Sequence, residues 1–274
     1  MPNEAFDTEL GKLDASAFEE AGRKRAPRPQ LVAPCTPLFV LRETPCPYLE
    51  GRLERKLVAE LPPGDTTLYT ELSRAGFRRS HRFAYRPACR ACEACVPVRI
   101  PVERFRPSRS QKRIAKRNRD LTSGSRAAKA DGEQYELFLA YLQARHNGGE
   151  MAGMAYGDYR AMIEDTVLPS RLVELRDGAG RLRAACLVDW LDDGPSAVYS
   201  FFDPSDADRS LGTEIILRLI EETRSRQLPS VYLGYWIADS PKMAYKARFR
   251  PLQALGPDGW TLLPDSAADS SADS

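Results

Sequence analysis

The sequence predicts an α+β protein, and three observations support that class. Residues 171–191, "RLVELRDGAGRLRAACLVDWL", carry two apolar runs around the turn "DGAG", which is typical of a β-hairpin. Residues 197–236 then give a strand, a long amphipathic helix and a second strand. Up to about residue 101 the chain is instead rich in Pro, Cys and aromatic residues, with short elements. We therefore expect regular α+β structure in the second half and a Cys-bearing α+β region in the first.

Composition describes an ordinary globular chain. Its 274 residues suit one large domain or two modest ones. The 40 basic and 38 acidic side chains nearly cancel, and 42% of residues are hydrophobic. No apolar run is long enough to cross a bilayer, so no membrane partner is expected. The start "MPNEAFDTEL" lacks the pattern of a signal peptide, and we expect a cytoplasmic protein.

The elements of the first half are short. "RKLVAEL" at 55–61 suggests a short helix, and "FAYRPAC" at 83–89 and "CVPVRIPV" at 95–102 suggest strands. Pro107 and Ser108 favour a helix start, and the following residues favour helix through Asp120. The segment up to residue 133, rich in Gly, Ser and charge, resembles a linker.

The second half is more regular. Residues 135–146 and 156–168 have apolar residues at helical spacing. After the hairpin, the chain predicts a strand at 197–203, a helix at 209–227 and a strand at 230–236.

Three of the six cysteines are spaced for a shared ligand. Cys89, Cys92 and Cys95 form "CRACEAC", and two-residue gaps let thiols turn inward around one ion or cluster. A fourth ligand would come from Cys46, Cys35 or His81. The spacing does not decide between a structural zinc and an iron–sulfur cluster, and three reduced cysteines in a turn are the alternative.

Positive charge gathers at residues 104–119, "RFRPSRSQKRIAKRNR", where eight of sixteen residues are Arg or Lys and none is acidic. On a helix, like charges three and four residues apart repel one another unless an anion lies against them. A solvated face is one interpretation. The lack of acids favours a phosphate backbone, so a nucleic acid is the expected partner of the basic residues Arg106, Arg109, Lys112, Arg113, Lys116 and Arg117.

The start of the helix at 209–227 offers a second anion site. Ser210 is placed to cap a helix whose free N–H groups point into the preceding loop. Arg209 and Gly212 also fit the pyrophosphate loop of acetyl-CoA acetyltransferases, but Glu214 replaces the last small residue of that pattern. An acetyl-CoA enzyme is thereby disfavoured, whereas an acyltransferase scaffold with another acyl donor remains open.

Several motifs together resemble a known family, the bacterial aminoacyl-tRNA–protein transferases of the leucyltransferase branch, which is related to the eukaryotic arginyl-tRNA–protein transferases. The similarity extends from about residue 35 to residue 260. It rests on "CPYLEGRLERK", "YTELSRAGFRRS", "YRPACRACEACVPVRIPVERFRPSRSQKR", "SFFDP", "RSLGT", "VYLGYWI" and "KMAYKARFRPL".

The resemblance implies an activity and a fold. The enzyme would move leucine from leucyl-tRNA to proteins whose first residue is Asp or Glu, which would mark them for degradation by the N-end rule. The fold implied is an acetyltransferase-like, GNAT-type C-terminal domain joined to the Cys-bearing region. An aminoacyl ester is already activated, so no cofactor is required for the chemistry, and catalysis can rest on positioning and oxyanion stabilisation.

Candidate site residues follow from this activity. Asp203, in "FFDP", follows a strand and could accept the acceptor's ammonium or its proton, although a turn-initiating Asp is equally expected there. Tyr199 could hydrogen-bond the aminoacyl-tRNA donor, and the alternative is that it packs in the hydrophobic core. The acceptor's acidic side chain would meet one or two of Lys242, Lys246, Arg248 and Arg250. Cys46 completes the expected metal set with Cys89, Cys92 and Cys95.

The expected domain organisation has five parts: a mobile arm at 1–30, a Cys-containing and tRNA-contacting region at 31–120, a linker at 121–133, an acetyltransferase-like catalytic domain at 134–263 and a disordered tail at 264–274. Two other functions stay open. One is a transferase that takes arginyl-tRNA as its donor, and the other is a non-catalytic RNA-binding protein with a metal knuckle.

Overall fold

A computed structural model describes residues 36–145 and 153–264 of the chain. The expected arm at 1–30 lies outside these residues, as does all but the first residue of the expected tail. Within the described ranges, no helix is long and apolar enough to cross a bilayer.

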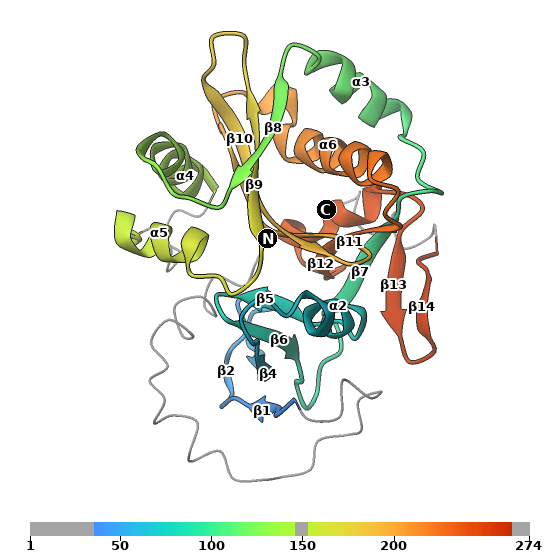
Figure 1. The fold of residues 1–274 in the computed structure, drawn as a ribbon. Coiled ribbons are helices and arrows are strands. Elements are labelled where there is room, and N and C mark those ends of the chain that lie inside the picture. Colours follow the sequence, from blue (N-terminus) through green and yellow to red (C-terminus); the bar gives the residue numbers. More distant parts are fainter. Residues whose placement is uncertain (1–35, 146–152, 265–274) are drawn as a thin grey trace.

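An eight-stranded mixed sheet forms the centre of the molecule (Figure 1). Its strands, in spatial order, are β14 (Gly259–Leu262), β13 (Gln253–Gly256), β7 (Val96–Pro101), β12 (Ser230–Trp236), β11 (Gly194–Phe202), β10 (Leu182–Leu191), β9 (Ser170–Arg176) and β8 (Thr122–Ala127). The predicted hairpin is confirmed, since β9 pairs antiparallel with β10 from Leu182↔Arg176 to Asp189↔Ser170. The predicted strand–helix–strand unit is also confirmed, because β11 and β12 are parallel and α6 (Leu211–Ser225) connects them.

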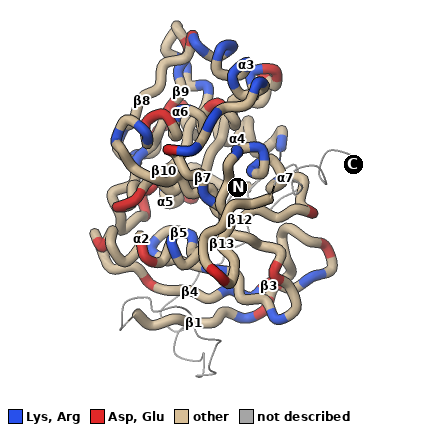
Figure 2. The backbone as a smooth tube through the Cα atoms, turned by 90° about the vertical axis from the view of Figure 1, so that its right-hand side faces the viewer, with Lys and Arg blue, Asp and Glu red and all other residues tan. Residues whose placement is uncertain are grey.

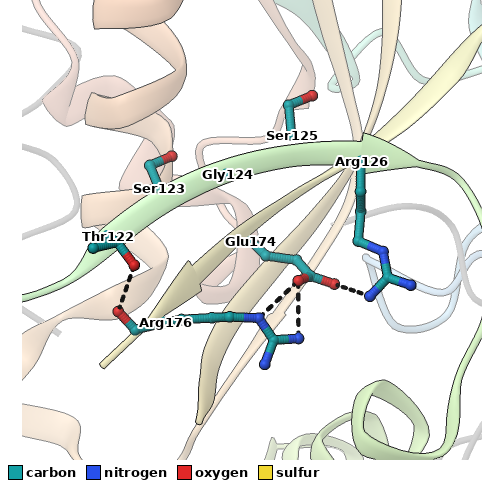
Figure 3. A pocket seen from close by; sticks show the side chains of 7 residues that line it. All are labelled: Thr122, Ser123, Gly124, Ser125, Arg126, Glu174 and Arg176. Atoms are coloured by element: carbon teal, nitrogen blue, oxygen red, sulfur yellow. Dashed lines mark hydrogen bonds and ion pairs between the residues drawn. The ribbon is translucent and has the colours of Figure 1, made fainter. Parts of the chain in front are cut away.

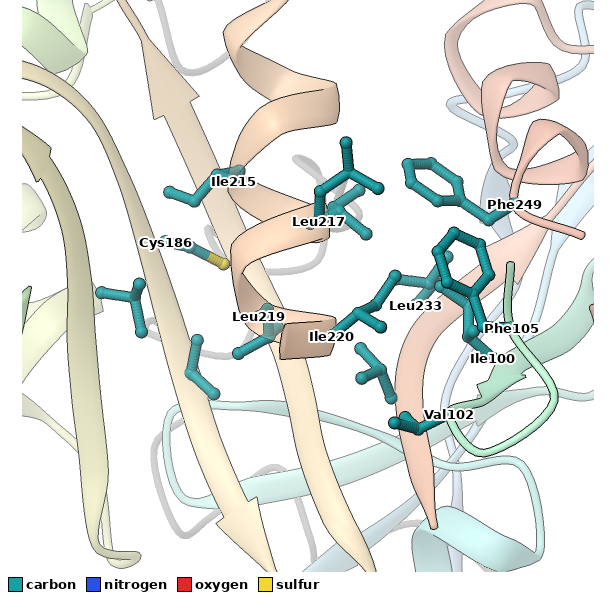
Figure 4. Close-up of a cluster of buried hydrophobic side chains, with 14 of the residues drawn as sticks. Ile100, Val102, Phe105, Cys186, Ile215, Leu217, Leu219, Ile220, Leu233 and Phe249 are labelled. Atoms are coloured by element: carbon teal, nitrogen blue, oxygen red, sulfur yellow. The ribbon is translucent and has the colours of Figure 1, made fainter. Parts of the chain in front are cut away.

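Helices cover both faces of this sheet. On one face, the buried side of α6 packs on β10 and β12 in a core that includes Ile215, Leu219, Cys186 and Leu233 (Figure 4). On the other face, α4 (Gly132–Arg145) and α5 (Tyr156–Glu164) pack on β10 and β11. The α+β class is therefore confirmed, with antiparallel strands followed by a parallel crossover.

The basic stretch forms α3 (Arg109–Arg117), close to its predicted bounds. Ser108 caps it: its Oγ accepts from the Gln111 N–H at 3.2 Å, and the Gln111 side chain accepts from the Ser108 N–H at 2.8 Å. Gln111 also donates to the Arg248 carbonyl at 3.1 Å, which anchors the first turn. Helix α3 lies beside α6.

A smaller sheet carries the first part of the chain. Its order is β1 (Phe39–Val40), β4 (Lys56–Glu60), β6 (Phe83–Pro87) and β5 (Arg78–Ser80), with α2 (Thr66–Arg74) packed against it. Beside it, β2 (Thr44–Pro45) pairs with β3 (Leu53–Glu54). Three short turns complete the chain: η3 (Ala207–Arg209), α7 (Pro241–Ala244) and η4 (Tyr245–Arg248).

Two sequence-based expectations are wrong. "RKLVAEL" is not a helix: Lys56–Glu60 is strand β4, paired at both edges by β1 and β6. Packing buries its apolar residues on both faces, with Leu57 and Ala59 in one cluster and Val58 in another. The expected linker at 121–133 contains strand β8, which pairs with β9 from Thr122↔Arg176 to Ala127↔Arg171, and the start of α4. Strand β7, from the expected first region, also lies within the large sheet, so the sheet spans the expected domain boundary.

One buried ion pair joins the two sheets. Arg79 of β5 donates to both carboxylate oxygens of Asp189 on β10, at 2.6 and 2.9 Å, and both side chains are 1% exposed. Ser170 donates to the same carboxylate at 2.5 Å. A fork-to-fork pair with an added hydrogen bond gives the docking of β5 a fixed geometry.

We predict that Asp189→Ala lowers the free energy of unfolding by about 3–5 kcal/mol, because it leaves the Arg79 guanidinium buried without a counter-charge. Urea denaturation followed by circular dichroism measures the change. The matched control is Glu60→Ala, which breaks a pair with Arg82 whose side chains are 54% and 55% exposed. This control substitution should lower the free energy of unfolding by no more than about 1 kcal/mol. Equal effects of the two substitutions would contradict the role given to the buried pair.

Candidate functional site

Asp203 and Tyr199, the two expected catalytic residues, lie in different surroundings. Asp203 follows β11 and accepts from the N–H and Oγ of Ser205 at 2.9 and 2.6 Å, with Arg183 at 3.3 Å. Burial raises the pKa of its carboxyl, but these hydrogen bonds and Arg183 outweigh burial and lower it overall. Such a carboxylate holds a turn and is a weak proton acceptor. Tyr199 is 3% exposed and packs on Phe138 in the core.

The loop before α6 is held by the protein's own contacts. Arg209 pairs with Asp120 at 2.6 Å and with Asp206 at 3.4 Å. Ser210 occupies the N-cap position but makes no side-chain capping bond. A Cβ at Gly212 would lie 2.8 Å from the Phe202 ring, so close packing explains this glycine. The structure therefore gives Arg209 and Gly212 structural contacts, whereas the expected side-chain cap by Ser210 is not formed.

Glu214 is fully buried in the first turns of α6, and Arg218 donates to it at 2.7 Å. The carboxylate that departs from the pyrophosphate-loop pattern is thus neutralised within its own helix.

The four cations after β12 differ in how far their side chains are exposed to solvent. Lys242 and Arg248 are exposed. Arg250 is half-buried and donates to the Ala247 carbonyl at 2.8 Å. Lys246 alone of the four is buried, at 1% exposure, and its Nζ lies 2.6 Å from the Tyr235 carbonyl. Burial, and then the charge of Arg78, lower the pKa of Lys246 to about 7.

Arg78 is a residue that the sequence analysis did not single out. It lies at the end of β5 nearest to the large sheet, where its Nη1 donates to Ser196 Oγ at 3.1 Å and its Nη2 donates to the Ala197 carbonyl. Only the two adjacent cations in "GFRRS", which follow Phe77 directly, could have indicated it.

Lys and Arg are frequent along the backbone of α3, whose positions are coloured blue in Figure 2. Arg109, Lys112, Arg113 and Lys116 are exposed. In the described part of the chain, none of these four forms an ion pair with Asp or Glu. Arg117 and Arg106 instead donate to backbone carbonyls, Arg117 to that of Asp208 and Arg106 to those of Glu103 and Phe105. The exposed face can therefore take an external polyanion.

A hollow of about 220 Å³ lies along β8 and β9, lined by Thr122, Ser123, Gly124, Ser125, Arg126, Glu174 and Arg176 (Figure 3). Its cations are already neutralised, since Arg126 and Arg176 both pair with the buried Glu174 at 3.3 and 2.9 Å. We assign it no role in the reaction.

Four cysteines gather beside the small sheet. Burial raises the pKa of the Cys95 thiol to about 12, and the charges of Cys46, Cys89 and Cys92 add to the rise, so the four thiols lie near one another. All four are half-buried and reduced. Arg52 donates to Cys92 Sγ at 3.2 Å. His81 instead faces Asp165 at 3.5 Å, and Cys35 lies outside the described residues.

The chemistry of this donor set fits a soft metal ion, because thiolates select zinc or iron–sulfur clusters. The side-chain positions do not form a closed shell, however: no three Cys, His, Asp or Glu side chains within 36–145 and 153–264 are arranged to share one ion.

The large sheet with an unneutralised basic helix at its side defines the class as far as the geometry goes: an α+β protein with a surface for a polyanion. Sequence comparison then gives the family. Residues 44–113 match the family model "Arginine-tRNA-protein transferase, N terminus", and residues 133–256 match its C-terminal counterpart.

Curated relatives carry a more specific name. The "Aspartate/glutamate leucyltransferase" of Paramagnetospirillum magneticum is 54% identical over 81% of this chain and 91% of its own length. The protein of the same name from Gluconacetobacter diazotrophicus is 51% identical over 86% of this chain and 89% of its own. The chain belongs to the aspartate/glutamate leucyltransferase family and is a transferase.

Among solved structures, it is similar to L-PGS from Bacillus licheniformis, with 12% identity, 73% of this chain and 65% of that chain covered, and a TM-score of 0.44. FemX gives 8% identity, coverages of 73% and 79%, and a TM-score of 0.40. With both scores below 0.5, these similarities carry no argument about function.

We propose that Cys46, Cys89, Cys92 and Cys95 hold one zinc ion or one iron–sulfur cluster. Elemental analysis of anaerobically purified protein should find stoichiometric zinc or iron, and Cys92→Ser should reduce it. Cys186→Ser, which changes a cysteine buried in the core beneath α6, is the matched control and should leave metal content unchanged. If the wild-type protein contains neither zinc nor iron, the proposal is wrong.

Proposed function

We propose that the protein transfers leucine from leucyl-tRNA to the N-terminal Asp or Glu of acceptor proteins. The single observation that supports this most strongly is the 54% identity, over 81% of this chain, to a protein named "Aspartate/glutamate leucyltransferase". The charge distribution is consistent with it, because a tRNA donor requires a surface that binds phosphates.

The reaction needs no further activation. The acceptor's neutral α-amine attacks the carbonyl of the aminoacyl ester, a new amide bond forms, and the ester bond to the ribose breaks. The proton lost by the amine balances the ribose hydroxyl that leaves. An α-amine with a pKa near 8 is partly neutral at pH 7, so positioning and stabilisation of the oxyanion are the main requirements.

We place the tRNA on the exposed side of α3. Arg109, Arg113 and Lys116 are available for phosphate oxygens, whereas Arg117 and Arg209 are occupied by contacts within the protein. Helix α3 lies against α6, whose N-terminus follows the loop after β11. A charged 3′ end bound here would have a short path to the parallel strands.

The biological role we infer is N-end rule tagging in the cytoplasm, where charged tRNA and the acceptor proteins are present together.

We expect purified protein and leucyl-tRNA to add leucine to peptides beginning with Asp or Glu, without ATP or acetyl-CoA. Peptides identical except for a first Asn or Ala should be poor acceptors, and N-acetylated Asp peptide should not react because its amine is blocked. Arginyl-tRNA in place of leucyl-tRNA tests the alternative donor. Mass spectrometry of the peptides measures transfer, and no transfer to any acidic N-terminus would contradict the proposal.

The triple variant Arg109→Gln, Arg113→Gln, Lys116→Gln should weaken tRNA binding and flatten its salt dependence. If three phosphate contacts are lost, the slope of log K against log[salt] falls by about 2 to 3. The melting temperature should stay unchanged, because these side chains are exposed and not ion-paired within the described chain.

The control removes the same charge from Arg42, Arg82 and Arg90, which are exposed and lie outside α3. If α3 is instead a basic helix stabilised by the protein's own acids, the α3 triple variant lowers the melting temperature and binds tRNA as the wild type does.

A further inference from the structure

Four basic side chains are buried in the described chain: Lys56, Arg78, Arg79 and Lys246. Two of them have a carboxylate partner, since Lys56 lies 2.6 Å from Glu54 and Arg79 lies 2.6 Å from Asp189. Arg78 and Lys246 form no ion pair with an acid anywhere in residues 36–145 and 153–264. Buried charges in proteins are normally paired, so this difference calls for a physical explanation.

Arg78 and Lys246 meet the same part of β12. Gly234 has φ +79°, and a Cβ there would lie 2.8 Å from Arg78 Nε and 2.9 Å from its Cζ. The next residue, Tyr235, accepts the Lys246 Nζ through its carbonyl at 2.6 Å. The absence of a side chain at Gly234 thus makes room for the Arg78 guanidinium, one residue before the carbonyl that Lys246 contacts.

Arg78 also reaches the neighbouring parallel strand. Its contacts with Ser196 and Ala197 place it on β11, at the position where Ser196 pairs with Tyr232 of β12. Guanidinium has five N–H donors, and two of them are used here. Within the described residues, the remaining donors of Arg78 are available to an anion, and the ammonium of Lys246 contacts the Tyr235 carbonyl and Met243 Sδ.

The electrostatics of the pair favour such an anion. Arginine cannot lose its proton in a protein, so Arg78 stays charged, and burial together with Arg78 lowers the pKa of Lys246. A carboxylate bound between the two would supply the missing counter-charge and restore the charged form of Lys246.

We propose that Arg78 and Lys246 bind the side-chain carboxylate of the acceptor's first residue and so select Asp and Glu. This inference rests on the proposed function. Of the four expected acceptor-binding cations it keeps only Lys246, on η4, and it adds Arg78, on β5. The bidentate geometry of guanidinium suits a carboxylate, and the pair lies where the parallel strands β11 and β12 meet.

The test compares wild-type protein with Lys246→Met and Arg78→Gln. Methionine keeps the length and apolar body of the lysine but removes its charge, so the fold should be retained. Steady-state transfer is measured with leucyl-tRNA and two peptides that differ only in a first Asp or Asn. The control is Lys129→Met, which removes an exposed lysine before α4.

We expect each site variant to raise KM for the Asp peptide about tenfold to a hundredfold, since a charge-assisted hydrogen bond is lost. The KM for the Asn peptide and for leucyl-tRNA should change little, so that the preference for Asp collapses. Lys129→Met should keep the wild-type preference.

Three outcomes overturn the inference. If both variants fold and keep the Asp preference, the pocket lies elsewhere. A rise in KM for leucyl-tRNA instead of the Asp peptide would identify the anion as a phosphate of the donor. Failure of the dipeptide Asp-Ala to raise the melting temperature of wild-type protein more than Asn-Ala also counts against it, and this measurement needs no variant. If wild-type protein transfers no leucine at all, the proposed function fails first, and the dipeptide measurement still tests the site.

Discussion

The Arg79–Asp189 ion pair sets the relation between the two sheets on which the candidate site depends. Both partners are almost fully buried. Removing either one would leave the other as an unpaired buried charge, which is strongly destabilising. Further contacts between the two sheets lie near this ion pair. Arg74 of α2 pairs with Asp193 at 2.8 Å, and Thr70 accepts from the Asp192 N–H at 3.1 Å. The turn between β10 and β11 is therefore held by α2 and β5.

That joint determines where Arg78 lies. Because Arg79 is fixed on β10, the adjacent Arg78 is directed to β11, the next strand of the large sheet. Its guanidinium fills the space left by Gly234 on β12. A residue from the small sheet thus reaches strands β11 and β12 of the large one, and the two sheets are joined at the proposed acceptor site.

A second joint connects the basic helix to the same region. Asn118, at the end of α3, donates to the Arg209 carbonyl at 2.8 Å, and Arg218 of α6 donates to the Asn118 carbonyl at 3.3 Å. Arg209 in turn pairs with Asp120. The cations of this joint are used internally, whereas those on the outer face of α3 are not. Internal pairing thus separates the arginines that hold the fold from those available to a tRNA.

Local patterns in the sequence determined the elements whose signals are short-range. The hairpin at 171–191, the helix capped by Ser108 and the parallel strand–helix–strand unit all follow from periodicity, turn chemistry and capping, and the structure has them. The motifs also determined the family, since they are distributed over both halves of the chain.

What the sequence could not determine depends on contacts between distant residues. Lys56–Glu60 became a strand because β1 and β6 pair with it, and Thr122–Ala127 became an edge strand because β9 offered it hydrogen bonds. Nor could spacing distinguish Lys246 from the three cations beside it, or connect it with Arg78, 168 positions earlier in the chain. Burial and charge pairing are properties of the packed molecule, and only the tertiary structure decides them.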